Sequence, residues 1–206
     1  MTALNITCMP EENLAAVIGQ RIEAFKASLR HGADVALDQH VLRHNCSLVG
    51  IEIEQGVRES IAVEFGAAVD HVYMVGSAKL GFSPKPGQYF KHFSDQSDID
   101  VAVVSSDLYT AIWHEVHQMD RAGEFYSREK FAHYHLMGWI RPDVLPSRTE
   151  YTRCHDWWKF FKQLSAKEDF LRIKINGGLY YDTNFLRQYQ LGGLTVLREQ
   201  LLSGSA

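Results

Sequence analysis

The segment 72–104 constrains the fold and the function of this chain more than any other part of it. It begins with the apolar run VYMV, which Gly76 and Ser77 follow, and it ends with the run VAVV, which Asp98, Ile99 and Asp100 precede. Residues two apart on a β-strand share a face, so Asp98 and Asp100 are expected to project together while Ile99 points into the core. Two adjacent carboxylates repel each other unless a cation lies between them. Because Mg²⁺ prefers carboxylate oxygens and completes its shell with phosphates and water, the pattern predicts a metal site.

The Gly-Ser pair predicts the other half of a nucleotide site. Gly76 ends the first apolar run without a side chain, and the hydroxyl of Ser77 can cap the turn that follows. Backbone N–H groups of such a turn are free to face an anion. A phosphate chain is therefore expected between this turn and a metal held by Asp98 and Asp100. Lys79 lies just after the turn and is the nearest cation that could meet a phosphate.

An apolar strand is followed by a Gly-Ser pair and then by an Asp-x-Asp pair. This order resembles the signature of nucleotidyltransferases of the DNA polymerase β superfamily. The two halves read MVGSAKLG and SDIDVAVV here, and the resemblance covers the segment 72–104 of a chain of 206 residues. It implies an α+β fold with a small mixed sheet. It also implies that Gly76 and Ser77 hold a nucleoside triphosphate, and that Asp98 and Asp100 bind Mg²⁺ or Mn²⁺ during transfer of a nucleotidyl group.

The sequence departs from the family pattern in the spacing of the two halves. Twenty residues separate Ser77 from Asp98, and the excess, SPKPGQYFKHF, is rich in proline, glycine and aromatic residues. This composition predicts a loop, 83–93, inserted at the mouth of the site. Its lysines, together with Lys174 further along the chain, are candidates to meet a triphosphate or an acceptor, and solvated surface lysines are the alternative.

The sequence also departs from the family pattern because it has no clear third metal ligand. No apolar strand interrupted by an aspartate follows Val104. Asp143 is the leading candidate, since it lies in the proline-bracketed segment WIRPDVLP. An ion pair with Arg141 or a turn contact is its alternative role. Asp169 and Asp182 are weaker candidates because helix capping explains both.

The composition sets limits on the class of protein. A chain of 206 residues with 46% hydrophobic residues can bury a core, and a formal charge of −4 lacks the broad basic field of a general nucleic-acid binder. The three cysteines form no CxxC motif, which favours a reducing cytoplasm. The sequence predicts neither a secretion signal nor a membrane span.

Helical periodicity dominates the first 66 residues, which are expected to pack on a nucleotidyltransferase-like core, 67–206, as one compact unit. Pro10, Glu11 and Glu12 predict the start of a helix that ends at His31. The other predicted helices are 35–44, 48–65, 106–119, 127–137, 149–166 and 182–202, and the predicted strands are 71–75, 99–104 and 170–175. The caps expected for the fourth helix are Ser106 or Asp107. Gly177 and Gly178 predict a turn, and the segment 138–146, with two prolines, predicts a structured turn or a crossing loop. The aromatic cluster Trp157, Trp158, Phe160 and Phe161 is expected in the core.

Three functions are compatible with these patterns. The first is transfer of a nucleotidyl group from an NTP to an unidentified protein, RNA end, nucleotide or small molecule, by a small stand-alone enzyme of the kind found in toxin or antiphage defence modules. The second is a nucleotide-binding sensor or scaffold of the same fold without turnover, with a protein partner. The third is an ordinary α+β interaction domain in which Asp98 and Asp100 are surface acids.

Overall fold

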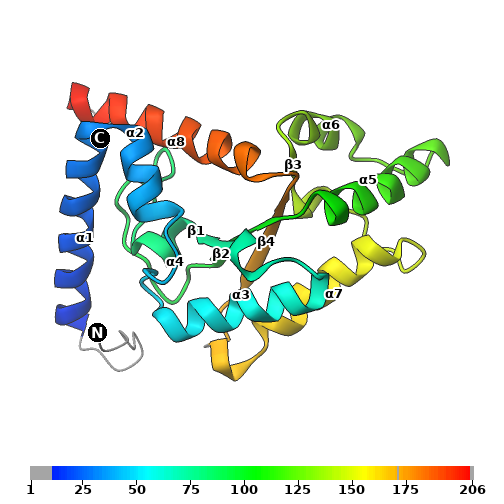
Figure 1. Cartoon of the computed structure of the whole chain (residues 1–206), viewed down its shortest axis with the longest axis horizontal. Coiled ribbons are helices and arrows are strands. Elements are labelled where there is room, and N and C mark those ends of the chain that lie inside the picture. The colour runs from blue at the N-terminus through cyan, green and yellow to red at the C-terminus, as the bar shows by residue number, and fades with distance from the viewer. Residues whose placement is uncertain (1–10, 171, 205–206) are drawn as a thin grey trace.

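The protein folds around one four-stranded mixed β-sheet that helices enclose, which confirms the expected α+β class (Figure 1). The computed structural model describes residues 11–170 and 172–204. Its helices are α1 (Glu11–His31), α2 (Ala33–Ala36), the π-helix η2 (Leu37–Val41), α3 (Ile51–Phe65), α4 (Gly76–Leu80), α5 (Ser106–Arg121), α6 (Arg128–Leu136), α7 (Thr152–Ser165) and α8 (Thr183–Ser203). Its strands are β1 (Val72–Val75), β2 (Ile99–Val104), β3 (Trp139–Ile140) and β4 (Ile175–Tyr180), and 3₁₀ turns are η3 (Val69–His71), η4 (Pro142–Val144) and η5 (Glu168–Phe170).

The sheet has the strand order β1-β2-β4-β3. Strand β2 pairs antiparallel with β1 and parallel with β4, and β3 pairs antiparallel with β4. In this register Asp100 lies between Val75 of β1 and Asn176 of β4. The rest of β2 is buried, as its β-branched apolar sequence predicts.

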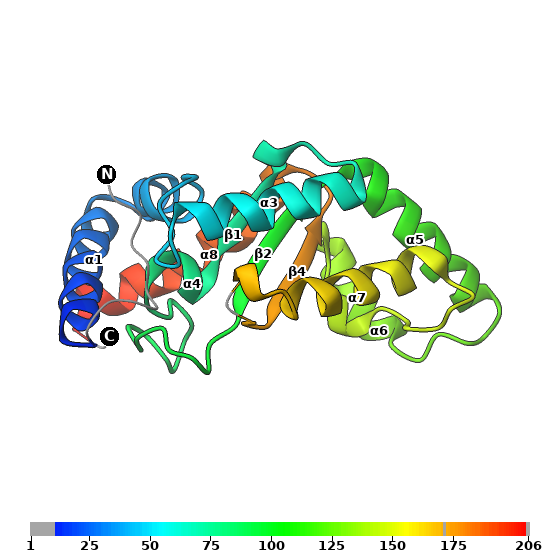
Figure 2. The same cartoon turned by 90° about the horizontal axis from the view of Figure 1, so that it is seen from below.

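Helices cover both faces of the sheet. In Figures 1 and 2, α3 and α7 lie across one face and α8 lies across the other. Helix α1 stands at the end of the molecule beside α2 and the last turns of α8, where Arg198 Nε donates to the carbonyl of Leu29 at 2.9 Å. The helical segment 11–65 and the sheet therefore share one hydrophobic core. No helix in the described part of the chain combines the length and the apolarity needed to cross a bilayer.

The early part of the chain follows the sequence predictions closely. Helix α1 has the predicted bounds, although the expected start signal at Pro10 lies outside the described residues. Strands β1 and β2 match their predicted ranges within one residue.

The cap predicted for α5 was wrong, because Ser105, and not Ser106 or Asp107, accepts the N–H of Leu108 with its side chain. The predicted helix 35–44 is instead a short α-helix that continues as a π-helix and ends at Val41.

The prediction for the last strand was wrong. Strand β4 runs from Ile175 to Tyr180, straight through the two glycines that predicted a turn. Both glycines have close neighbours: a Cβ at Gly177 would meet the ring of Phe161 at 2.1 Å, and one at Gly178 would meet Trp139 Nε1 at 2.8 Å. The glycines thus let aromatic side chains approach the strand backbone. The segment 138–146 likewise contains the short strand β3 and the turn η4.

The aromatic cluster of α7 lies in the core, as the helical spacing predicts. Trp157 and Phe161 are 1% and 6% exposed, and both rings stack on Phe65 of α3, with ring centroids 5.0 and 6.2 Å away. These contacts join α7 to α3 across the same face of the sheet.

A buried ion pair joins α3 to α4. The Nζ of Lys79 lies 2.9 Å from Oε1 of Glu54, and the side chains are 1% and 0% exposed. Glu54 also accepts the backbone N–H groups of Asn45 and Ser47, at 3.0 and 2.9 Å. Burial alone raises the pKa of the Glu54 carboxyl, but the charge and hydrogen bond of Lys79 outweigh it, so the pKa lies below its ordinary value.

We expect Lys79→Met to lower the free energy of unfolding by about 3–5 kcal/mol, because the charge of Glu54 stays buried without its partner. Urea denaturation measures the change. The matched control is Lys159→Met on the exposed side of α7, which is expected to change stability by less than about 0.5 kcal/mol. Equal stability of the two variants would contradict a structural role for the Glu54–Lys79 pair.

Candidate functional site

The two aspartates that the sequence singles out lie together at the start of β2. Asp98 immediately precedes the strand and Asp100 is its second residue, whereas Ile99 between them is fully buried. Their side chains are 38% and 31% exposed. The expected alternation therefore holds, with two carboxylates projecting on one face and the intervening side chain in the core.

Strand β4 supplies an amide to both carboxylates. The Nδ2 of Asn176 donates to Asp98 Oδ2 at 2.9 Å and lies 3.5 Å from Asp100 Oδ1. The parallel pairing of β2 with β4 sets this contact, because Asn176 is the register partner of Asp100. The next residue, Gly177, faces Phe161 of α7, so Asn176 faces the opposite side of the sheet, which α8 covers.

Two lysines flank the carboxylates. Lys174 Nζ donates to Asp98 Oδ2 at 3.0 Å, and Lys85 Nζ lies 3.8 Å from Asp100 Oδ2. Both lysine side chains are more than two-thirds exposed, at 68% and 69%. Their contacts are therefore solvent-screened, and a stronger anion can draw the ammonium groups away at little cost.

The predicted insertion lies beside the carboxylates, as the contact of Lys85 indicates. Its two arms are joined by a bridge between Phe82 and His92 and by hydrogen bonds from the N–H of Ser83 to Lys91 O and from the N–H of Phe93 to Gly81 O, both 2.8 Å long. The insertion thus has its own backbone pairing.

The Gly-Ser turn touches Asp100 directly. Gly76 has a φ of +69°, a conformation that favours glycine, and a Cβ there would lie 2.9 Å from Asp100 Oδ2. Ser77 is the second residue of α4. The residue before this helix, Val75, makes no side-chain capping hydrogen bond. The structure therefore brings together four of the predicted site residues: Gly76, Ser77, Asp98 and Asp100.

The other predicted site residues lie elsewhere. Lys79 points into the interior and binds Glu54, so its expected position at a phosphate was wrong. Asp143 forms ion pairs with Lys130 at 2.9 Å and with Arg141 at 2.6 Å, which is the alternative role considered for it. Asp182 caps α8 by accepting the N–H of Phe185, and Asp169 is exposed in η5.

The local environment disfavours a charge on Asp100. Burial raises the pKa of the Asp100 carboxyl above its ordinary value, and the neighbouring charge of Asp98 adds to the effect. Lys85, the hydrogen bond from Asn176, and Lys174 act in the opposite direction and lower the pKa. A cation placed between the carboxylates would relieve their repulsion.

The donor set fits a hard divalent cation. Asp98 and Asp100 offer carboxylate oxygens, and Asn176 offers an amide oxygen once its side chain turns over. Within residues 11–170 and 172–204, no three His, Cys, Asp or Glu side chains cluster as metal ligands. One or two carboxylates suit Mg²⁺, which usually takes its remaining ligands from phosphates and water.

An aromatic surface lies on the same face, and the sequence did not reveal it. Trp139 of β3 stacks on Tyr180 of β4 with an interplanar angle of 4°, and its ring centroid lies 4.5 Å from that of Tyr189 on α8. Burial raises the pKa of the Tyr189 hydroxyl, and the charge of Asp100 contributes to the shift. The Trp139 Nε1 is buried and has no hydrogen-bond partner among the described residues. The pairing of β3 with β4 brings Trp139 to Tyr180, and the packing of α8 brings Tyr189 to both rings, so no local sequence signal could have found them.

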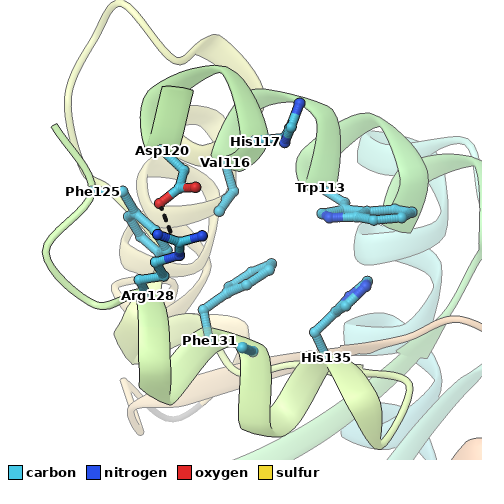
Figure 3. Close-up of a pocket in the computed structure, with 9 residues that line it drawn as sticks. Trp113, Val116, His117, Asp120, Phe125, Arg128, Phe131 and His135 are labelled. Carbon is cyan, nitrogen blue, oxygen red and sulfur yellow. Dashed lines mark ion pairs between the residues drawn. The ribbon is translucent and has the colours of Figure 1, made fainter. Parts of the chain in front are cut away.

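A separate cavity lies between α5 and α6 (Figure 3). It has a volume of about 150 Å³, and aromatic side chains such as Trp113, Phe131 and His135 line it. An ion pair between Arg128 and Asp120, 3.5 Å long, closes one side. None of the aspartates or glycines of the candidate site lines this cavity.

Gly76→Ala is expected to destabilise the protein by about 1–2 kcal/mol, because the alanine must adopt a left-handed conformation and its Cβ meets Asp100. Gly19→Ala in α1 is the matched control, since a Cβ there meets nothing within 4 Å. That substitution should stabilise the protein by about 0.5–1 kcal/mol. Opposite signs in urea denaturation support the geometry, and two stabilising changes would refute it.

Asp100→Asn is expected to raise the melting temperature of the metal-free protein at neutral pH. Because the pKa of Asp100 is raised in the folded state, its ionisation costs stability, and this cost appears as the pH rises through that pKa. The gain should therefore shrink as the pH falls and the wild-type carboxyl becomes protonated. Calorimetric melting curves of both proteins between about pH 3 and pH 8 measure it. A gain that does not depend on pH would point to packing instead of charge.

Comparison with known proteins assigns this chain to no family. No family model matches the chain, and no curated protein or solved structure matches it significantly. The resemblance of the segment 72–104 to polymerase β-like nucleotidyltransferases therefore stays a prediction from the motif alone. The function of the site has to be argued from its side chains.

Proposed function

We propose that the protein is a Mg²⁺-dependent nucleotidyltransferase that moves a nucleotidyl group from an NTP to an acceptor. The observation that supports it best is the convergence of Asp98 and Asp100 with Asn176, next to the tight turn at Gly76. Strands β2 and β4 hold these groups on a sheet face, and rigid elements position reacting groups better than loops do.

The two carboxylates hold the cation and, through it, the triphosphate. When bound, Mg²⁺ supplies Lewis-acid stabilisation of the negative charge on the transferring and leaving phosphates. Gly76 has no side chain, which lets the Asp100 carboxylate lie against the turn, and the Ser77 hydroxyl and N–H are donors for a phosphate oxygen. Asn176 fixes the orientation of both carboxylates through its amide.

Lys85 and Lys174 supply the positive charge for the leaving pyrophosphate. In the protein without nucleotide, each ammonium group forms an ion pair with one of the aspartates. Both side chains are exposed, so with a nucleotide bound they would turn from the carboxylates to the phosphates, where each point charge would stabilise the developing negative charge. Lys85 belongs to the insertion 83–93, so this loop takes part in closing the site.

The aromatic surface of Trp139 and Tyr189 is the place for a planar ring, either the nucleobase or an aromatic acceptor. It lies on the face of the sheet that carries Asp100, as the influence of Asp100 on Tyr189 indicates. Stacking on aromatic side chains accepts any base, which fits an enzyme without a base-specific pattern of donors. The acceptor is a protein, an RNA end, a nucleotide or a small molecule, and a role in a toxin or defence module is consistent with the size of the chain.

Nucleotide binding without turnover is the second candidate, and Asn176 favours it. An amide cannot accept the proton of an attacking hydroxyl, and it adds no charge to hold a second metal ion. A sensor or scaffold would keep the Asp pair and the phosphate turn but transfer nothing.

Pyrophosphate release with each of the four NTPs and Mg²⁺ tests the proposal. We expect the double variant Asp98→Asn/Asp100→Asn to lose at least about two orders of magnitude in rate while its melting temperature stays at or above that of the wild type. Asp95→Asn, an exposed acid in the loop before β2, is the control and should keep full activity. Equal turnover of the double variant and the control would overturn the assignment.

Titration calorimetry with the same nucleotides separates the two candidates. Mg²⁺-dependent binding with transfer of an α-labelled nucleotide to an acceptor favours the enzyme, and binding without product favours the sensor. In the latter case, Asn176→Asp supplies the absent third carboxylate and is expected to strengthen Mg²⁺ binding. If no nucleotide binds in the presence of Mg²⁺, both candidates fail and the aspartates are surface acids of an interaction domain.

A further inference from the structure

A second cavity, of about 390 Å³, lies between α1, the π-helix η2 and the end of α4. Two arginines and a histidine line it: Arg21, Arg43 and His40. None of the described residues that line it is acidic. Lys79 also contributes to the wall, but its ammonium is bound to Glu54, so the two arginines set the charge of the cavity.

Arg21 is a half-buried cation that backbone carbonyls hold in place. Its Nη1 donates to Cys46 O at 3.1 Å and to Lys79 O at 3.2 Å, and its Nη2 donates to Ser47 O at 3.4 Å. Burial lowers the pKa of Arg21, while Cys46 and Glu54 raise it by charge. A guanidinium has five N–H donors, so these three bonds fix its plane and leave donors for a further acceptor.

Arg43 and His40 extend this positive surface. Arg43 is exposed, and its guanidinium has no hydrogen bond or ion pair to any described residue. His40 is half-buried, and its Nε2 lies 2.9 Å from the hydroxyl of Ser28. Burial lowers the pKa of His40, and the charges of Arg21 and Arg43 lower it further. All three groups therefore gain from an anion placed among them.

The floor of the cavity is apolar. Phe25 and Phe82 pack edge to face with centroids 5.2 Å apart, and Leu80 lies beside them. The ring of Phe25 also meets His40, at 5.5 Å. Phe25, Phe82 and Leu80 are 0%, 0% and 4% exposed, so they close the cavity from below and a ligand meets the basic groups of its rim. In the cavity of Figure 3, by contrast, Asp120 already balances Arg128.

We propose that this cavity binds a small oxyanion, whose phosphate or carboxylate group meets Arg21, Arg43 and His40. Arginine is suited to this role because its planar fork matches the oxygens of both groups. The site is independent of Asp98, Asp100 and Mg²⁺.

Phenyl phosphate is the first probe, titrated into the full chain with EDTA and at constant ionic strength, with the His40 imidazole followed by NMR. We expect saturable binding and a rise in the pKa of His40, because a nearby anion favours the imidazolium. Exposed His71 serves as the reference histidine and should not shift. Inorganic phosphate should also bind, since the charged group makes the contacts. Benzoate distinguishes the sources: tighter binding than phenyl phosphate assigns the site to carboxylates, and weaker binding assigns it to phosphate esters.

Arg43→Ala should weaken phenyl phosphate binding by about tenfold, the usual effect of losing a charge-assisted hydrogen bond. Arg30→Ala, an exposed arginine near the end of α1 that does not line the cavity, is the matched control and should bind normally. The variant Asp98→Asn/Asp100→Asn should also bind normally, which separates this site from the proposed nucleotide site. Absence of saturable binding, or equal binding by Arg43→Ala and Arg30→Ala, would overturn the proposal.

Discussion

The parallel pairing of β2 with β4 is the interaction on which the candidate site depends. It places Asn176 opposite Asp100 and within reach of Asp98, so that residues 76 positions apart in the sequence share one hydrogen-bond network. A shift of one residue in this register would turn Gly177 toward the carboxylates and Asn176 toward α7. The glycines help to hold the register, because the rings of Phe161 and Trp139 occupy the space that a side chain at either glycine would need.

The cations of the structure divide into two groups with different roles. Lys79 is buried, and its pair with Glu54 fixes α4, whose first residue touches Asp100. Lys85 and Lys174 are exposed, and their ion pairs with the aspartates are accessible to solvent. Buried pairs are costly to break and exposed pairs are not, so the first kind supports the frame of the site and the second is free to respond to a ligand.

Local patterns predicted the half of the site that lies within the segment 72–104. The runs of β1 and β2 are short, apolar and β-branched, and Asp98 and Asp100 alternate with Ile99, so both strands and both carboxylates could be placed. The other half depends on tertiary contacts. The partner of Lys79 is a glutamate 25 residues earlier, and nothing near Lys79 in the sequence indicates it.

The fourth strand illustrates the same limit. A Gly-Gly pair is typical of a turn, but here the aromatic side chains of α7 and β3 need both glycines within a strand. Because the predicted strand ended at residue 175, Asn176 was not among the predicted metal ligands. A search for carboxylates alone could not have found it, because the residue opposite Asp100 is an amide.

A crystal structure with Mg²⁺ and a non-hydrolysable NTP tests the assignment of this site most directly. We predict Mg²⁺ at about 2.0–2.1 Å from oxygens of Asp98 and Asp100, with the triphosphate beside Gly76 and Ser77 and with Lys85 and Lys174 turned to the phosphates. A triphosphate bound away from β2, or Lys174 still paired with Asp98 in a crystal that contains the nucleotide, would contradict it.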